Sequence, residues 1–323
     1  MNNMKFLVTG GSGFIGTNVI DFLLGQGGKV VSIDIVPPAN SNHIGLFQEC
    51  DIRNVELLKS TIEIEQPDYV IHLAARTDLD GKVIDDYTSN TVGVESLCQV
   101  CSSSVSIKKI LFASSMLVCS AGYIPESIHE TCPTTPYGHS KAIGETIVRD
   151  FAPQLPDFVI VRPTSIWGPW FNEPYKNFFN MVLNQSFVDA GPRLAKKTYG
   201  YIDNVCGQIV SLVTTQDNLR NKLVYLGDDE PLAIRRWAFD IAAVSGKRPP
   251  LRVPYGLIKC AALAGDLLSV LGVRFPMTSF RLTNMTTNNI LDCSIATKLN
   301  KYPVTDYNAA NRRTVEWLNR KGR

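Results

Sequence analysis

The chain has 323 residues, of which 45% are hydrophobic and 19% charged, and its formal net charge is +2. This ordinary composition excludes a disordered or fibrous protein and suffices for one large domain or two modest ones. A net charge so close to zero gives no global electrostatic reason to bind nucleic acid or a membrane.

The first half of the chain alternates short apolar runs with helical patterns. We expect strands at 5–10, 29–34, 46–50, 69–74, 109–114 and 158–163, and helices near 14–26, 54–64, 88–104 and 138–152. Strands that alternate with helices are typical of βαβ units and of a parallel sheet covered on both faces. The sequence therefore predicts an α/β fold with a doubly wound parallel sheet.

A glycine-rich turn connects the first predicted strand to the first predicted helix. It reads TGGSGFIG, with Gly10, Gly13 and Gly16 at three-residue intervals. Glycines in this context let the backbone approach a pyrophosphate at the helix N-terminus. Asp34 ends the second strand, where a carboxylate can accept hydrogen bonds from ribose hydroxyls. The next residues, IVPP (35–38), contain no arginine for a 2′-phosphate, so the sequence favours NAD over NADP.

Two later motifs suggest acid–base chemistry. Ser114 and Ser115 leave the carboxyl end of the fifth predicted strand, and ligands of open α/β sheets bind at that edge. In TTPYGHSK (134–141), a threonine and a proline begin a helix, so that Tyr137 lies in its first turn and Lys141 on the same face. A free tyrosine has a pKa near ~10, and nearby positive charge stabilises its phenolate. The spacing therefore fits a tuned acid/base.

After Pro163 the character of the chain changes. Residues 164–179 are rich in aromatics, proline and glycine, as expected of loops that close over a ligand, and 198–205 and 222–228 look like return strands. Helices and short irregular pieces follow from about 230. We therefore expect a dinucleotide-binding domain at 1–163 with return segments near 198–228, and a smaller substrate-binding lobe at 164–197 and 229–323.

The remaining features predict neither a metal site nor a membrane anchor. Cys98 and Cys101 have CxxC spacing, but no second pair or nearby histidine accompanies them. The N-terminus shows no signal-peptide pattern, and the scattered cysteines fit a reduced cytoplasmic protein. Lys259 and Asp266 interrupt the apolar segment 257–272. We expect that segment to form a packed helix, with a helix on a membrane surface as the alternative, and we expect no stable membrane insertion.

Taken together, the motifs resemble the extended short-chain dehydrogenase/reductase superfamily, in its NAD-dependent epimerase/dehydratase branch. They occur in the family's order over nearly the whole chain: TGGSGFIG (9–16), Asp34, DIR (51–53), HLAA (72–75), Asn90, SSMLV (114–118), YGHSK (137–141) and RPTSIWGP (162–169). The resemblance implies a Rossmann-type domain that binds NAD, a smaller C-terminal substrate-binding lobe, and a homodimer formed by the helices near 90–104 and 138–152.

The resemblance also implies residue roles. Tyr137 would be the base, Lys141 would orient the nicotinamide ribose, and Ser115 would assist Tyr137, because Ser115–Val118 fits the family's Ser/Thr-x-x-Val pattern. The cofactor would contact Gly10, Gly13, Phe14, Ile15, Gly16, Asp34, Asp51, Ile52, Leu73, Ala74, Ala75, Asn90, Tyr137 and Lys141. The substrate would contact Arg76, Thr77, Ser115, Ser165, Lys197 and Arg281.

Three departures from the family pattern limit the substrate and the reaction. Met116 and Leu117 occupy the places where the dehydratases carry acids, which disfavours elimination of water. The family's sugar-nucleotide enzymes usually have asparagine and tyrosine where this chain has Ser165 and Trp167. Lys197 stands where they have a diphosphate-binding arginine, and lysine keeps the charge but loses the bidentate fork.

The leading interpretation is an NAD-dependent epimerase of a nucleotide-activated sugar, which works by transient oxidation to a keto intermediate. A second is a net dehydrogenase or reductase of a keto-sugar or of a bulkier alcohol, as in the 3β-hydroxysteroid dehydrogenase-like group. A third, a catalytically silent NAD-sensing or scaffold protein, is disfavoured because Ser115, Tyr137 and Lys141 are all present.

Overall fold

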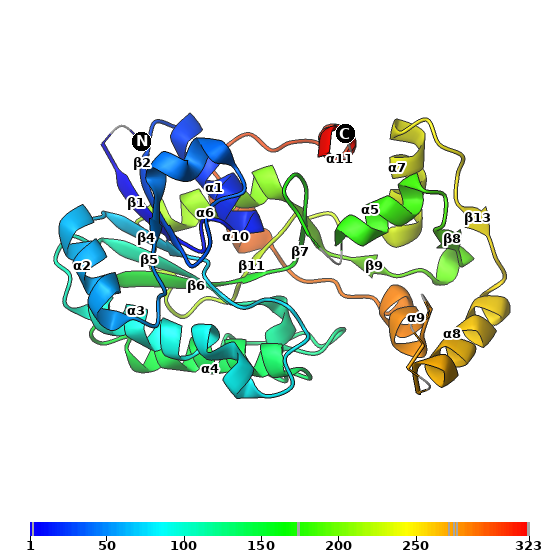
Figure 1. Ribbon diagram of the computed structural model, residues 1–323, viewed down its shortest axis with the longest axis horizontal. Coiled ribbons are helices and arrows are strands. Elements are labelled where there is room, and N and C mark those ends of the chain that lie inside the picture. Colours follow the sequence, from blue (N-terminus) through cyan, green and yellow to red (C-terminus); the bar gives the residue numbers. More distant parts are fainter. Residues whose placement is uncertain (2, 173–174, 271, 274, 276, 322–323) are drawn as a thin grey trace.

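A seven-stranded parallel sheet forms the centre of the larger part of the molecule (Figure 1). The computed structural model describes residues 1–323 apart from 2, 173–174, 271, 274, 276 and 322–323. The strands lie in the order β11 (Val224–Leu226), β6 (Asp157–Pro163), β5 (Lys109–Ala113), β4 (Tyr69–His72), β1 (Lys5–Thr9), β2 (Lys29–Asp34) and β3 (Phe47–Glu49). The order reverses between β1 and β4, so their carboxyl ends diverge into a crevice in which ligands of such sheets bind.

Helices cover both faces of the sheet, which confirms the doubly wound, Rossmann-type α/β fold. One face carries α1 (Phe14–Gly25), α6 (Ile202–Thr214) and α10 (Ser294–Leu299), and the other carries α2 (Val55–Glu65), α3 (Val92–Ser102) and α4 (Pro136–Asp150). The central strands are buried except at some of their end residues, and all four residues of β4 are buried. This explains their nearly continuous apolar sequences.

The predicted return strand at 198–205 is wrong over its second half. Only β10 (Tyr199–Tyr201) is extended, and it pairs with β7 (Ser165–Trp167) outside the main sheet. Helix α6 begins at Ile202 because Ile202, Val205 and Ile209 recur at helical spacing and are all fully buried. The second predicted return segment does contribute β11 to the main sheet.

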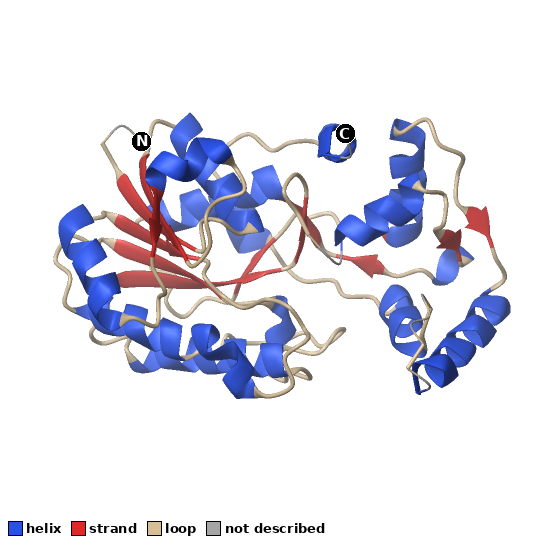
Figure 2. Ribbon diagram, in the orientation of Figure 1, coloured by secondary structure: helices blue, strands red, loops and turns tan. Residues whose placement is uncertain are grey.

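The smaller part of the molecule consists of helices and short strand pairs, at the right of Figure 2. It contains α5 (Tyr175–Leu183), α7 (Ile234–Val244), α8 (Tyr255–Val270) and α9 (Ser279–Thr286), with the pairs β9 (Lys196–Lys197) with β12 (Leu232–Ala233) and β8 (Val188–Asp189) with β13 (Leu251–Arg252). The last helix, α11 (Tyr307–Lys321), packs against α7, whereas α10 packs on α6. We propose that these two parts correspond to the two predicted domains, except that α10 packs with the larger part.

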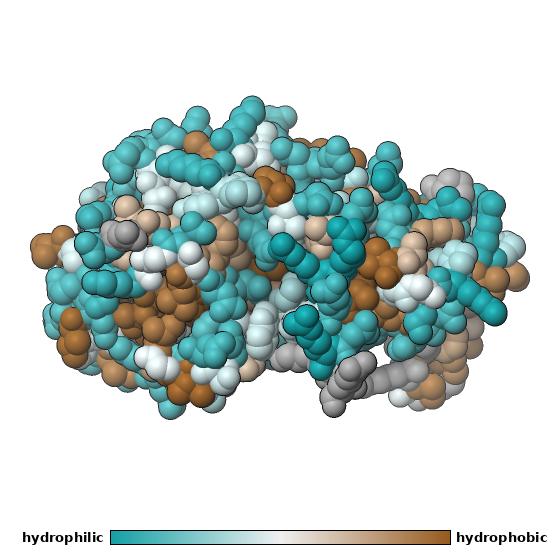
Figure 3. Space-filling view, turned by 90° about the horizontal axis from the view of Figure 1, so that it is seen from above, coloured by the Kyte–Doolittle hydropathy of each residue, from teal (hydrophilic) through white to brown (hydrophobic). Residues whose placement is uncertain are grey.

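Residues 257–270 of the apolar segment lie in α8, whose described side chains are buried on one face and exposed on the other. Ile258 and Ala262 are buried, whereas Leu257, Leu263 and Leu267 are 62%, 57% and 67% exposed. Within the residues described, no helix is long and apolar enough to cross a membrane. On the face of the molecule in Figure 3, hydrophilic residues predominate and the hydrophobic ones form scattered groups.

Candidate active site

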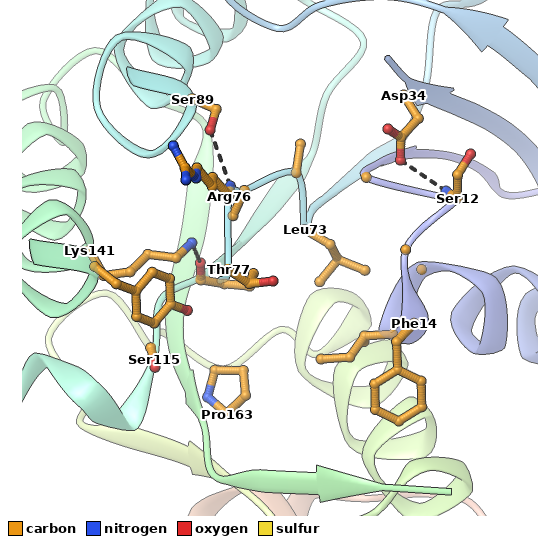
Figure 4. A pocket seen from close by; sticks show the side chains of 18 of the residues that line it. Ser12, Phe14, Asp34, Leu73, Arg76, Thr77, Ser89, Ser115, Lys141 and Pro163 are labelled. Atoms are coloured by element: carbon orange, nitrogen blue, oxygen red, sulfur yellow. Dashed lines mark hydrogen bonds between the residues drawn. The ribbon is translucent and has the colours of Figure 1, made fainter. Parts of the chain in front are cut away.

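A cavity of about 740 Å³ runs along the carboxyl ends of the central strands. It begins between the glycine-rich turn and the end of β2, passes the end of β4, and reaches the N-terminus of α4 and the loop after β7. Figure 4 shows side chains from these separate elements converging on the space.

Steric constraints explain the glycines of the first turn. Gly10 has a φ of +71°, and a Cβ there would lie 2.5 Å from the Ala74 backbone nitrogen. A Cβ on Gly16 would collide with the Gly10 carbonyl oxygen. Helix α1 has no side-chain cap at Gly13 and no acidic residue in its first turn. Its N-terminal amides, which border the cavity at Phe14 and Ile15, therefore fit a pyrophosphate.

Asp34 closes one end of the cavity. Its carboxylate accepts hydrogen bonds from the backbone amides of Ser12 at 3.0 Å and Ile35 at 2.7 Å (Figure 4). These bonds fix its orientation and leave lone pairs for ribose hydroxyls. Asp51 lies nearby and forms a bidentate ion pair with Arg53, which holds the pKa of Asp51 below its usual range. The Arg53 charge is thus already neutralised by Asp51 and is not left for a 2′-phosphate, so this end of the cavity fits the adenosine of NAD.

The middle of the cavity is apolar. Leu73, Ala74 and Ala75 follow β4 and line it, and Ile52 contributes from the neighbouring loop. Asn90 does not line the cavity. Its side chain is fully buried, donates to the Arg76 carbonyl and the Ser140 hydroxyl, and accepts from the Arg76 amide. Its position therefore suits holding the segment after Ala75 rather than touching a cofactor.

The N-terminus of α4 places the candidate base. The Thr135 hydroxyl caps the helix by accepting from the Gly138 amide at 3.0 Å, and Pro136 occupies the first turn. Tyr137 is 7% exposed, and burial raises the pKa of its phenol to about 12, although a hydrogen bond with Ser115 acts to lower it. An additional positive charge is therefore needed to make this phenol a base at neutral pH.

Lys141 supplies one such charge from the next turn of α4. The residue is 5% exposed, and its ammonium donates to the Ala113 carbonyl at 2.8 Å, at the end of β5. Burial lowers the pKa of Lys141 to about 8, although the negative charge of Glu145 acts to raise it, and none of the ion pairs between described residues involves Lys141. A buried, ion-pair-free ammonium beside a cofactor cavity is typical of a functional group rather than a structural one.

The two serines after β5 have different surroundings. The Ser114 hydroxyl donates to Glu145 Oε1 at 2.6 Å, and Glu145 is also bound by the buried Arg162 at 2.8 Å. Ser115 instead caps the 3₁₀ helix η3 (Met116–Val118) by accepting from the Leu117 amide and hydrogen-bonds with Tyr137. Ser115 is therefore the hydroxyl positioned to act together with Tyr137.

The expected substrate residues are not all brought to this cavity. Arg76 and Thr77 line it, but the Arg76 guanidinium pairs with Asp78 at 2.8 Å and lies over the Tyr87 ring. Ser165 lies in β7 and accepts a hydrogen bond from the Tyr175 hydroxyl. Lys197 and Arg281 lie in β9 and α9, outside the residues that line the main cavity.

Lys197 nevertheless has the properties of an anion site. Its ammonium donates to Asn284 Oδ1 at 2.6 Å, and Asn284 lies one helical turn after Arg281 in α9. Burial lowers the pKa of Lys197 to about 8. Among the ion pairs between described residues, none involves Lys197.

Several cavity residues could not be recognised from the sequence. They come from η3, from β7, from the loop after β7 and from the start of α5, and they are Met116, Leu117, Ile166, Phe171, Asn172 and Tyr175. For the four residues after 163, the signal was the aromatic, proline-rich composition of residues 164–179, which indicated a loop over a ligand without identifying which side chains face it; Met116 and Leu117 were noted only for the acids they replace. No group of acidic, histidine or cysteine residues suited to a metal occurs in the part of the chain that is described.

Comparisons with known proteins agree with this geometry. The family described as "NAD dependent epimerase/dehydratase family" matches residues 6–226, more than half of the chain. The dTDP-D-glucose 4,6-dehydratase of Dictyostelium discoideum is 30% identical over 233 residues, which are 62% of this chain and 53% of that protein. A putative UDP-glucose 4-epimerase of Methanocaldococcus jannaschii is 27% identical over 252 residues, 73% of this chain and 80% of that protein. The chain thus spans about half the length of the first relative and most of the second.

A solved structure extends the fold comparison over both parts of the molecule. The UDP-glucose 4-epimerase of Thermotoga maritima, solved with UDP-glucose, has a TM-score of 0.76 and 22% identity. The superposition covers 99% of this chain and 100% of that one. The smaller part therefore has the fold of its counterpart in that protein.

Proposed function

We propose that this chain, which belongs to the NAD dependent epimerase/dehydratase family, is an NAD-dependent epimerase of a nucleotide-activated sugar. One arrangement carries the proposal: Asp34 and the glycine-rich turn lie at one end of a single cavity, and Ser115, Tyr137 and Lys141 lie at the other. Names of the relatives support the substrate class, since they include epimerases and a dehydratase of nucleotide-linked sugars.

The residues of this chain would divide the chemistry among themselves. NAD, when bound, supplies the hydride acceptor and donor. Tyr137 would remove the proton of a sugar hydroxyl through its phenolate oxygen and later return it. Ser115 would hold the same oxygen, and Lys141 would stabilise the phenolate while orienting the nicotinamide ribose. The apolar middle of the cavity would keep water away.

The residues beside Tyr137 support epimerisation over dehydration. Elimination of water requires an acid and a base next to the reacting carbons. Met116 and Leu117 line the cavity where such groups would stand, and neither side chain can transfer a proton. A carboxylate does lie close by, but Glu145 is buried in its ion pair with Arg162 on the far side of Ser114.

The nucleotide diphosphate would bind toward the smaller part of the molecule. Lys197 offers a half-buried ammonium whose hydrogen bond goes to a neutral amide, so its charge is available to a phosphate. Lysine contributes a point charge rather than a bidentate fork. We expect Lys197→Met to raise the KM for the nucleotide sugar at least about tenfold, with the Kd for NAD unchanged.

Two further features complete the proposal. Val92 on α3 and Ile143 on α4 are 45% and 37% exposed on adjacent helices, and we propose that they join a homodimer interface; light scattering of the purified protein tests this. All eight cysteines are free thiols, the state expected in a reducing cytoplasm, and we propose that location.

The activity is tested by mixing purified protein with UDP-, GDP- and dTDP-sugars and trace NAD. Sugar signals are followed by NMR and NADH by absorbance in the same tube. A new sugar isomer without net NADH supports the epimerase. NADH that accumulates in proportion to substrate loss would make the protein a dehydrogenase, and Tyr137→Phe serves as the inactive control.

A further inference from the structure

Two cysteines pair through their backbones beside the segments that carry the candidate catalytic groups. Cys119 and Cys132 are partners in an isolated parallel β-bridge, and the Cys132 amide donates to the Val118 carbonyl at 2.9 Å. Bridge partners have Cα atoms about 5 Å apart, within the ~4.4–6.8 Å that a disulfide spans. Neighbours in a parallel pair also direct their side chains to the same side. The Cys119 thiol donates to the Glu130 carbonyl at 3.7 Å, and the Cys132 sulfur is hydrogen-bonded with the Ser120 hydroxyl at 3.6 Å.

The two thiols have complementary reactivity. Burial acts to raise the pKa of the Cys132 thiol, but hydrogen bonds from the Ser120 amide and hydroxyl and from Cys119 outweigh it, so the pKa lies below its ordinary value. Cys132 is also only partly buried. Cys119 is 4% exposed, and burial raises the pKa of its thiol. Cys132 therefore fits an attacking thiolate and Cys119 a resolving thiol.

The pair connects the two segments that carry the candidate catalytic groups. Cys119 directly follows η3, whose cap is Ser115, and Cys132 lies three residues before Thr135, the cap of α4. The intervening loop, 120–131, reaches the smaller part of the molecule, where the Gly122 amide donates to Asn289 Oδ1 at 3.3 Å. A bond between the two sulfurs would close this loop at its base.

We propose that Cys119 and Cys132 form a reversible modification site, a dithiol that a hydroperoxide converts to a disulfide. The Cys132 thiolate attacks a peroxide oxygen, which gives a sulfenic acid and hydroxide. The Cys119 sulfur then attacks the Cys132 sulfur and displaces that oxygen, which leaves with the Cys119 proton as water. In total, two thiols lose two electrons and two protons, and one hydrogen peroxide becomes two waters.

A second close pair provides an internal comparison. Cys98 and Cys101 lie one turn apart in α3, are both fully buried, and have thiol pKa values that burial raises. The same peroxide should leave them reduced. Cys260 on α8 is exposed and could form bonds between molecules, so the test uses a Cys260→Ser background.

The test treats the reduced full-length protein with one equivalent of hydrogen peroxide, alkylates the remaining thiols after denaturation, and maps the peptides by mass spectrometry. The proposal predicts a disulfide-linked pair containing Cys119 and Cys132, two mass units below the sum of the thiol peptides, with Cys98 and Cys101 alkylated. Hydrogen exchange of residues 120–131 should slow, and a thiol reductant should reverse both changes.

Single variants distinguish a built pair from general oxidation. In Cys132→Ser, Cys119 should remain alkylatable after the same treatment; in Cys119→Ser, Cys132 should accumulate as sulfenic or sulfinic acid. Free thiols at both positions in the parent protein after the peroxide treatment would overturn the proposal. So would a Cys98–Cys101 disulfide that forms first. The readout needs no activity, so it is independent of the proposed function.

Discussion

Replacing Lys141 by methionine should stabilise the protein while it abolishes activity. Burial lowers the pKa of Lys141 from the ordinary 10.5 to about 8. This difference of roughly 2.5 pKa units, at ~1.4 kcal/mol each, makes the buried ammonium cost about 3.5 kcal/mol of folding free energy at neutral pH. The variant also loses the hydrogen bond to the Ala113 carbonyl, which destabilises it by ~1 kcal/mol. Lys141→Met should therefore raise the free energy of unfolding by about 2.5 kcal/mol.

The pH dependence of this gain has a definite sign. Between pH 8 and 10.5 the native Lys141 has lost its proton while the unfolded chain still binds it. The stability of the parent protein therefore rises with pH across this window, because the unfolded state binds more protons. The advantage of Lys141→Met is full below pH 8 and shrinks as the pH approaches 10.5.

Urea denaturation measures this effect on protein freed of nucleotide, because a bound ligand would stabilise the parent protein by mass action. Lys259→Met on the exposed surface of α8 is the matched control and should leave stability within ~0.5 kcal/mol. A Lys141→Met protein less stable than its parent at pH 7 would refute the view that Lys141 is held there at a cost for function.

Three further predictions follow from the packing of the site. Gly16→Ala places a methyl group against the Gly10 carbonyl and should cost ~1–3 kcal/mol of stability and most of the NAD affinity. Gly25→Ala, which has open space around it, is the control and should change neither quantity. Thermal unfolding measures the stability, and NAD titration measures the affinity. Glu145→Gln leaves Arg162 buried without its counter-charge and should lower the free energy of unfolding by ~3–5 kcal/mol in urea denaturation. The double variant Glu145→Leu/Arg162→Met should recover most of that stability. A double variant as unstable as Glu145→Gln would contradict this explanation. Tyr137→Phe should lower kcat at least ~10²-fold with an unchanged Kd for NAD. In the parent protein, the absorbance of the Tyr137 phenolate should appear well below pH 12 once NAD binds, because the added positive charge lowers the pKa of Tyr137.

The parts of the site that the sequence could predict depend on short-range geometry. A turn between a strand and a helix, a carboxylate at a strand end and a Tyr–Lys pair one helical turn apart are each local patterns. The parallel sheet then brings their carboxyl ends together, which is why Asp34 and Tyr137 border one cavity. The doubly wound fold follows from the same alternation of strands and helices.

The parts that could not be predicted depend on pairings between distant residues. Nothing near Ser114 in the sequence indicates that its hydroxyl donates to Glu145, which is buried in an ion pair with Arg162. Nor does the sequence indicate that the Asn90 side chain is hydrogen-bonded to the backbone of Arg76. The start of α6 at Ile202 is likewise fixed by burial against the sheet rather than by a local signal. The meeting of Cys119 with Cys132 requires the loop between them to fold back.

The most direct test of the central claim is to convert the active nucleotide sugar in D₂O with trace NAD and to record the product by proton NMR. Transient oxidation with return of the same hydride predicts an inverted carbon that still carries its original protium, with no net NADH, and no conversion by Tyr137→Phe. Deuterium at the inverted carbon would mean that a solvent proton was added there, and it would contradict the account.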